Sequence, residues 1–230
     1  AQGRLLGPPL GASAPGAAAG LIGFSADEQL VVTGSAQAGI RFWQVPDLDE
    51  SADSEFARSI WTPSGDSVAV ATPDASRLVI GDQNGNVHVI AADAGKDGLL
   101  SRAQELSFFG HSAEVRRLAV SADGRLAASA ADDNTVRIWN VEDGLPRPFI
   151  AEIDGLEIER LAFEPGGERL AVLGPDSLRI LATGTGDQVA RFDLGERHTS
   201  MSFADNGRVY IGSASGALRA VGVNATGSWT

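Results

Sequence analysis

The chain has 230 residues, of which 43% are hydrophobic, and its formal net charge is -12 at pH 7. This length and apolar content suffice for a sizeable core, but no apolar run reaches the ~18 residues that a membrane span requires. The negative charge argues against nucleic acid as a partner, because binding to phosphates relies on Lys and Arg. The chain contains no cysteine, which excludes disulfides and zinc–thiolate sites and suits a reducing, cytoplasmic compartment.

A short turn signal recurs along the chain. An apolar residue is followed by a small or polar residue and then by a turn, and the apolar position falls at residues 24, 71, 120, 163 and 203. A spacing of 40–49 residues between these positions is typical of stacked structural repeats. Two short apolar segments follow each turn signal, so we predict three β-strands per repeat. The predicted units are 21–44, 67–90, 115–139, 157–181 and 198–221.

The third unit has the clearest pattern. It opens with Gly110-His111 and closes with Trp139-Asn140. This unit resembles the WD-repeat family, whose repeats begin with Gly-His and end with Trp-Asp, although Asn140 stands where the family has Asp. The resemblance implies an all-β fold, a β-propeller of four-stranded antiparallel blades. We expect about five WD-like repeats within a larger propeller.

A four-stranded blade needs an outer strand next to each predicted unit. We expect these strands near 4–10, 56–61, 104–109, 147–152 and 188–194. The first belongs to an upstream blade or closes a ring with the last unit. Residues 3–10 are similar to an outer strand of bacterial multi-blade WD-repeat proteins, including those whose propellers follow signal-transducing NTPase modules. We therefore interpret residues 1–230 as a single β-propeller region of a longer protein.

The resemblance also implies a structural hydrogen-bond tetrad in the third unit, formed by His111, Ser129, Asp133 and Trp139. A buried indole N–H needs an acceptor, which Ser129 supplies, and His111 can link Ser129 to Asp133. These residue types also form Ser-His-Asp catalytic sets. Ser129, however, lies in the middle of a predicted strand with no nucleophile elbow around it. We therefore predict a structural role and no catalytic residue.

The sequence offers little for other chemistry. His88 and His198 have no neighbouring ligand at metal-binding spacing, and we expect His88 to face solvent. The acidic segment 47–55 lacks the glycine of a calcium loop. It is a solvated loop or a landing site for an Arg-rich partner. No phosphate-binding loop is present, so we expect no metal, no cofactor and no enzyme activity.

The family binds protein partners through one propeller face. The residues that the resemblance places on this face are Gln83, Glu114, Arg116, Asp132, Glu157, Glu159 and Arg197. We expect this face to be exposed and mainly acidic, which favours a basic protein or peptide. Nucleic acid and membrane are not expected as partners, but other domains of the same longer chain are.

Three functions fit this sequence. The first is a noncatalytic interaction scaffold or sensor module of a larger, bacterial signalling protein. The second is a propeller enzyme with a site at the central channel, and the third is an autoinhibitory structural domain.

Overall fold

The computed structural model describes residues 20–24, 30–35, 39–44, 58–60, 68–74, 76–91, 105–142, 146–152, 157–204 and 206–222. These segments contain β-strands and no α-helix. The described part therefore has no helix capable of crossing a membrane. The expected outer strand near 4–10 and the acidic segment 47–55 lie outside the described residues.

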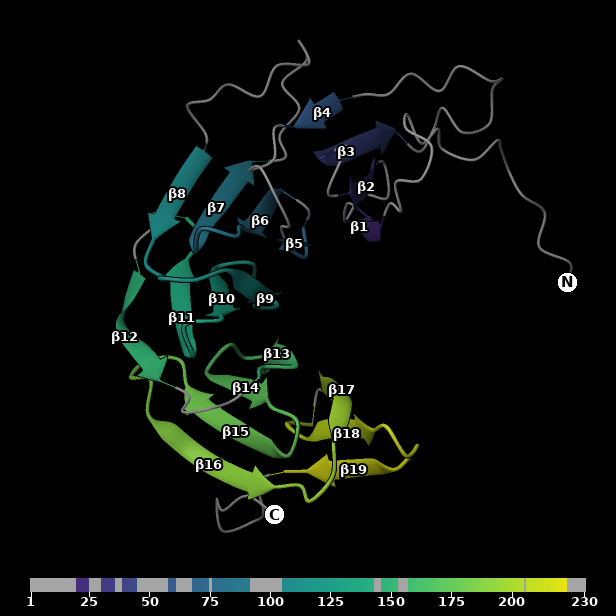
Figure 1. Cartoon of the computed structure of the whole chain (residues 1–230). Coiled ribbons are helices and arrows are strands. Elements are labelled where there is room, and N and C mark those ends of the chain that lie inside the picture. Colours follow the sequence, from purple (N-terminus) through teal and green to yellow (C-terminus); the bar gives the residue numbers. More distant parts are fainter. Residues whose placement is uncertain are drawn as a thin grey trace, which may run out of the picture.

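The strands form five antiparallel sheets (Figure 1), four of them with four strands and the last with three among the described residues. The bounds of the strands are, sheet by sheet: β1 Gly20–Phe24, β2 Leu30–Ser35, β3 Gly39–Gln44 and β4 Arg58–Ile60; β5 Val68–Ala71, β6 Arg77–Gly81, β7 Asn86–Ala91 and β8 Glu105–Phe109; β9 Val115–Val120, β10 Leu126–Ala131, β11 Thr135–Asn140 and β12 Pro146–Glu152; β13 Arg160–Phe163, β14 Arg169–Leu173, β15 Ser177–Ala182 and β16 Gln188–Asp193; β17 His198–Phe203, β18 Val209–Ser213 and β19 Leu218–Val221. Each strand pairs with the next strand of its own sheet, so every sheet is a simple up-and-down meander. The expectation of four-stranded antiparallel propeller blades is confirmed.

The blades stand side by side in an open arc (Figure 1), with β1, β5, β9, β13 and β17 on its inner side. Strands β4, β8, β12 and β16 form the outer edges of their blades. Each of these outer strands completes the sheet of the unit that precedes it in the chain, as the antiparallel pairing of β8 with β7 illustrates. The first and last blades lie on either side of the opening of the arc.

The turn signals fold as side-chain-supported turns. In the third blade the Ser121 hydroxyl donates to Asp123 at 2.6 Å, and the backbone N–H of Leu126 donates to Ser121 Oγ at 2.9 Å. In the second blade, Thr72 and Asp74 repeat the first of these contacts at 2.6 Å. A short polar side chain after the first strand thus satisfies the backbone where the chain reverses. These contacts explain the turn signal in the second and third units.

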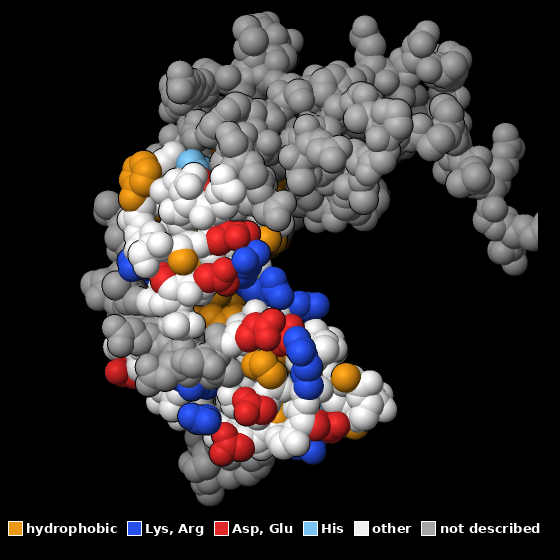
Figure 2. Space-filling view, in the orientation of Figure 1, with side chains coloured by type: hydrophobic (Ala, Val, Ile, Leu, Met, Phe, Trp, Pro, Cys, Tyr) orange, Lys and Arg blue, Asp and Glu red, His pale blue; other side chains and the backbone are white. Residues whose placement is uncertain are grey.

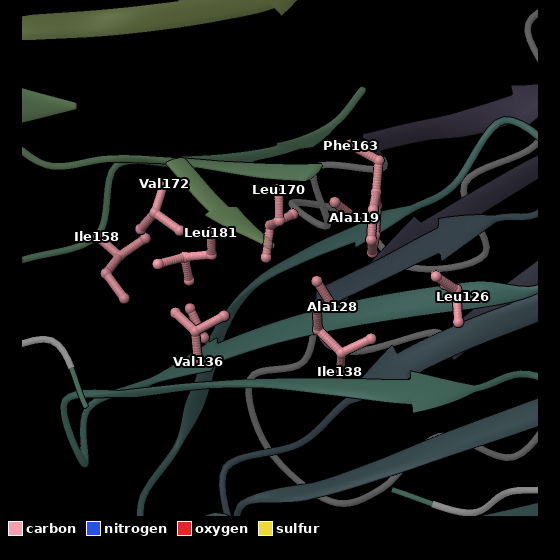
Figure 3. Packing of buried hydrophobic residues seen from close by; sticks show 11 residues of the cluster. Ala119, Leu126, Ala128, Val136, Ile138, Ile158, Phe163, Leu170, Val172 and Leu181 are labelled. Atoms are coloured by element: carbon pink, nitrogen blue, oxygen red, sulfur yellow. The ribbon is translucent and has the colours of Figure 1, made fainter. Parts of the chain in front are cut away.

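Packing between blades forms the core. Every residue of β10 is buried, because successive side chains of a strand point to opposite faces and both faces have a neighbour. One face contributes Ala128 and Ala130 to a cluster that includes Leu170 and Val172 of the fourth blade. Figure 3 shows Val136 of β11 opposite Leu181 of β15 within this cluster. The other face packs on the second blade. Strand β10 is therefore buried on both of its faces.

Candidate functional site

The structure brings the four predicted tetrad residues together in one hydrogen-bonded chain. The indole N–H of Trp139 donates to Ser129 Oγ at 2.8 Å. Ser129 Oγ lies 2.7 Å from His111 Nε2, and His111 Nδ1 lies 3.1 Å from both carboxylate oxygens of Asp133. Thr135, which the sequence analysis did not include, lies 2.9 Å from His111 Nδ1 and donates to Asp133 at 2.7 Å. The network therefore joins the loop before β9 to β10, β11 and the turn between them.

The protonation states follow from the environment of the two titratable groups. Burial lowers the pKa of His111, and the attraction of Asp133 only partly opposes this effect. Burial alone would raise the pKa of Asp133. Hydrogen bonds from the backbone N–H of Ser112 and from Thr135, together with His111, lower this pKa overall. Asp133 is thus a carboxylate and His111 is neutral at pH 7. Nδ1–H donates a hydrogen bond to Asp133, and Nε2 accepts a hydrogen bond from the Ser129 hydroxyl.

The tetrad sits at the junction between two blades. The Trp139 ring is 1% exposed and stacks on Phe108 of the second blade, with ring centroids 5.3 Å apart. The rings of Trp139 and His111 are in an edge-to-face arrangement, with centroids 6.3 Å apart. Ser129 has no exposed surface, so no substrate can reach its hydroxyl. This arrangement stabilises the packing and is unsuited to nucleophilic catalysis.

A second buried network occupies the second blade. His88 Nδ1 lies 3.0 Å from Ser107 Oγ on β8, and Nε2 lies 3.3 Å from Asp82 Oδ2. Asp82 also accepts hydrogen bonds from the Asn86 amide and from the backbone N–H of Asn84. Although burial opposes them, these bonds lower the pKa of Asp82. The carboxylate of Asp82 therefore accepts a hydrogen bond from the Nε2–H of His88.

The expectation that His88 faces solvent is wrong. His88 is 7% exposed, and Asp82 is 2% exposed. His88 pairs with Ile80 on one side and with Ser107 on the other, so the pairing of β7 with both neighbours places it inside the blade. The sequence held one indication of this burial: a polar residue in an otherwise apolar strand, with a serine in the strand that pairs with it. The indication can be recognised only when the pairing of the two strands is known.

Three of the residues predicted for the partner face, Glu114, Arg116 and Asp132, form a charge cluster. The Arg116 guanidinium donates to Asp132 at 3.0 Å and to Glu114 at 2.9 Å. Arg116 and Asp132 are exposed, and Glu114 is half-buried. One cation therefore offsets much of the charge of two carboxylates. The face is less acidic here than the sequence suggested.

Glu159 and Arg197 form an ion pair between the fourth blade and the entry to the fifth. Glu159 is 7% exposed, so the expectation that it is exposed is wrong. Glu159 is buried because Arg197, 38 residues further along the chain, donates a hydrogen bond to its carboxylate. Gln83 is exposed in the turn between β6 and β7, away from these two clusters in the chain.

A groove of about 600 Å³ lies at the junction of the third and fourth blades. Three predicted partner residues, Arg116, Asp132 and Glu157, are on its wall. The complete lining is Arg116, Arg117, Ala130, Ala131, Asp132, Asn134, Glu157 and Ile158. Figure 2 shows acidic and basic side chains next to one another along the inner side of the arc, around β9 and β13. Three of the seven predicted residues, from the third and fourth blades, thus border one concave, polar groove.

No group of three or more His, Asp or Glu side chains is arranged to hold a metal ion in the part of the chain that the structure describes. His198 is fully buried at the start of β17, and its Nδ1–H donates to the carbonyl of Glu196 at 2.7 Å. A ring held in this way stabilises the loop that leads into the fifth blade.

Comparisons with known proteins agree with this architecture. The family model described as "WD domain, G-beta repeat" matches residues 103–140, the segment that carries the tetrad. Protein HIR1 of Kluyveromyces lactis is 26% identical over 172 residues, which are 63% of this chain and 20% of that protein. WD repeat-containing protein SL1-17 of Schistosoma mansoni is 30% identical over 123 residues, which are 54% of this chain and 36% of that protein.

Among solved structures, a chain of the crystal structure of the mitotic checkpoint complex is similar, with a TM-score of 0.74 and 18% identity. The match covers 95% of this chain and 64% of that chain, so this similarity shows the fold. The chain spans a fifth of HIR1 and about a third of SL1-17. Both sequence relatives are eukaryotic, and neither carries the bacterial signalling context that the sequence resemblance implied.

Proposed function

We propose that the chain is a noncatalytic protein-interaction scaffold, and that a basic segment of a protein or peptide partner binds in the groove between the third and fourth blades. One observation carries the proposal. The groove is lined by Arg116 and Asp132 of the third predicted unit and by Glu157 of the fourth, all of them predicted to face a partner. WD-repeat proteins generally act as interaction scaffolds, and the buried Ser129 supports a role without catalysis.

The electrostatics favour Glu157 as the main contact for a basic side chain in this proposal. Asp132 and Glu114 share Arg116, whereas Glu157 is exposed and makes no hydrogen bond or ion pair with the described residues. An unpaired carboxylate keeps its full attraction for an incoming cation. Glu159, although predicted for the same face, is buried against Arg197 and is a poor contact.

The proposal also covers the compartment of the protein and the longer protein to which the chain belongs. It includes a cytoplasmic location, because a chain without cysteine suits a reducing compartment. It also includes a place in a larger signalling protein of bacterial type, which rests on the resemblance of residues 3–10 alone. Other domains of that longer protein are possible occupants of the same groove.

Affinity selection from a random peptide library tests the proposal. We expect peptides rich in Lys and Arg to be enriched on the native chain, and this enrichment to disappear on the Glu157→Lys variant. For a single selected peptide, the variant should weaken binding roughly three- to tenfold at low salt, because it replaces an attractive contact with a repulsive one.

Glu142→Lys is the matched control. Glu142 is exposed in the turn that follows β11 and is not part of the groove lining, so the variant changes net charge equally without altering the groove. Equal loss of basic peptides in both variants would attribute the selection to overall charge. Unchanged enrichment on Glu157→Lys would refute binding at this groove.

A further inference from the structure

We infer that the groove selects a partner segment that carries an acidic side chain beside its basic one, with Arg117 receiving the carboxylate and Glu157 receiving the cation. This inference rests on the proposed function and names the chemistry of its partner. A purely basic segment, which net charge alone would favour, leaves half of the site unused.

The state of Arg117 is the first observation. Its Nε donates to the backbone carbonyl of Glu159 at 2.8 Å, and Nη1 donates to the carbonyl of Arg116 at 2.8 Å. Both acceptors are neutral. Arg117 makes no ion pair with any residue that the structure describes. Its positive charge is therefore uncompensated, while two main-chain contacts fix its direction.

Arg116 provides the contrast on the same strand. Its guanidinium binds Asp132 and Glu114, so an incoming carboxylate would have to compete with two resident ones. Arg117 offers no such competition. A guanidinium has five N–H donors, and the two carbonyl contacts occupy only part of them. Arg117 is therefore the groove cation prepared for an anion from outside.

Glu157 is the second half of the site. This carboxylate also lines the groove and has no partner among the described residues. Arg117 and Glu157 thus border one concavity without neutralising each other. A pair of opposite, unpaired charges matches a ligand with the reverse arrangement.

The rest of the lining and the two opposite charges favour a mixed ligand over a ligand with charges of one sign. Ala130, Ala131 and Ile158 give the groove an apolar part that suits aliphatic side-chain stems or a peptide backbone. A ligand with cations alone would place one of them near Arg117, and like charges in a concave site repel. A ligand with anions alone would meet the same repulsion at Glu157.

Fluorescent, N-acetylated and C-amidated peptides of Ala, Gly and Ser test the inference. Four pools carry Arg and Glu, Arg and Gln, Gln and Glu, or two Gln, at matched and varied spacings. We expect the Arg–Glu pool to bind about three- to tenfold more tightly than the Arg–Gln pool. In Arg117→Gln this advantage should disappear, while the preference for Arg over Gln should persist. In Glu157→Gln the preference for Arg over Gln should disappear, while the advantage of the Arg–Glu pool over the Arg–Gln pool should persist.

Arg160→Gln is the matched control for a change in folding. Arg160 donates to the same carbonyl of Glu159, at 2.7 Å, but is not part of the groove lining. The control should keep both preferences. If its melting temperature falls as much as that of Arg117→Gln while its peptide selectivity is kept, the loss in Arg117→Gln is due to the groove.

The outcomes separate the two proposals. Equal binding of the Arg–Glu and Arg–Gln pools, with binding still dependent on Glu157, would overturn the role of Arg117 and leave the scaffold proposal standing. An advantage for Glu that survives in Arg117→Gln would also overturn it. Failure of every pool to bind, or binding that ignores Glu157, would overturn both proposals.

Discussion

The hydroxyl group of Ser129 shows how a buried polar network stabilises a blade of this protein. Ser129 accepts a hydrogen bond from Trp139 and donates one to His111, and it is completely buried. Each polar atom of the tetrad thus finds a partner without water, and Trp139 is held against Phe108 of the preceding blade. Buried networks of this kind stabilise when complete and destabilise when one member is removed.

The substitution His111→Ala tests the tetrad. It leaves Ser129 and Asp133 without their shared partner, and we expect it to lower the free energy of unfolding by about 2–4 kcal/mol. Denaturant titration measures this value. Glu142→Ala, in an exposed turn, should change it by less than about 0.5 kcal/mol. Equal stability of His111→Ala and the native chain would show that the network contributes nothing.

The network in the second blade makes a similar prediction. Ser107 links His88 to the outer strand β8, and His88→Leu would leave Asp82 buried without this partner. We expect a loss of about 1–3 kcal/mol. The same titration measures this loss. A higher free energy of unfolding for His88→Leu than for the native chain would mean that apolar packing alone can stabilise this blade.

At the scale of elements, close backbone approach couples one blade to the next. Gly85, in the turn between β6 and β7, has φ of 83°. A Cβ at this position would lie 2.5 Å from the carbonyl oxygen of His111. The turn of the second blade therefore rests directly on the loop that carries the tetrad histidine.

Gly85→Ala should thus destabilise the chain through both its positive φ and the contact with His111, by about 1–3 kcal/mol. Gly184→Ala is the matched control, because a Cβ there meets nothing within 4 Å. The comparison uses thermal unfolding of both variants. Similar melting temperatures for the two would contradict the close approach of these blades.

The register of the elements also explains which predictions succeeded. Turn signals, apolar segments and the tetrad depend on residues within one unit, and these local patterns anticipated β9, β10 and β11 closely. The burial of His88 depends on the pairing of β7 with β8, and that of Glu159 depends on Arg197. The uncompensated charge of Arg117 depends on which carbonyls it reaches. Such contacts between distant segments have no local pattern, so the sequence could not anticipate them.

At the scale of the whole molecule, the described blades are stabilised mainly by their neighbours. The three core clusters join successive blades, from the second to the fifth. In a stack of this kind the stability of each blade depends on its contacts with the adjacent blades. The outward turns and grooves at the blade junctions therefore have a fixed geometry, as a binding platform needs.

Stability should fall in acid in two steps. The pKa of His111 is lowered from 6.5, so below pH 6.5 the unfolded chain takes up a proton that the folded chain does not. The pKa values of Asp82 and Asp133 are lowered from 3.8. Their contribution is present above that pH and is lost as pH falls through the folded values.

Denaturant titrations from neutral pH to below pH 3.8 measure how the free energy of unfolding depends on pH. We expect the free energy of unfolding to decrease below pH 6.5 and to decrease further below pH 3.8. The first step should be reduced in His111→Ala. A free energy of unfolding that rises on acidification from neutral pH would contradict the assigned states of His111 and Asp133.

Hydrogen–deuterium exchange with and without the tightest selected peptide tests directly whether the junction of the third and fourth blades is the binding site. We predict slower exchange in 114–117, 130–134 and 157–158, which contain the groove lining, and unchanged exchange in β16 and β19. Protection confined to the outer strands, or to the fifth blade, would contradict the account.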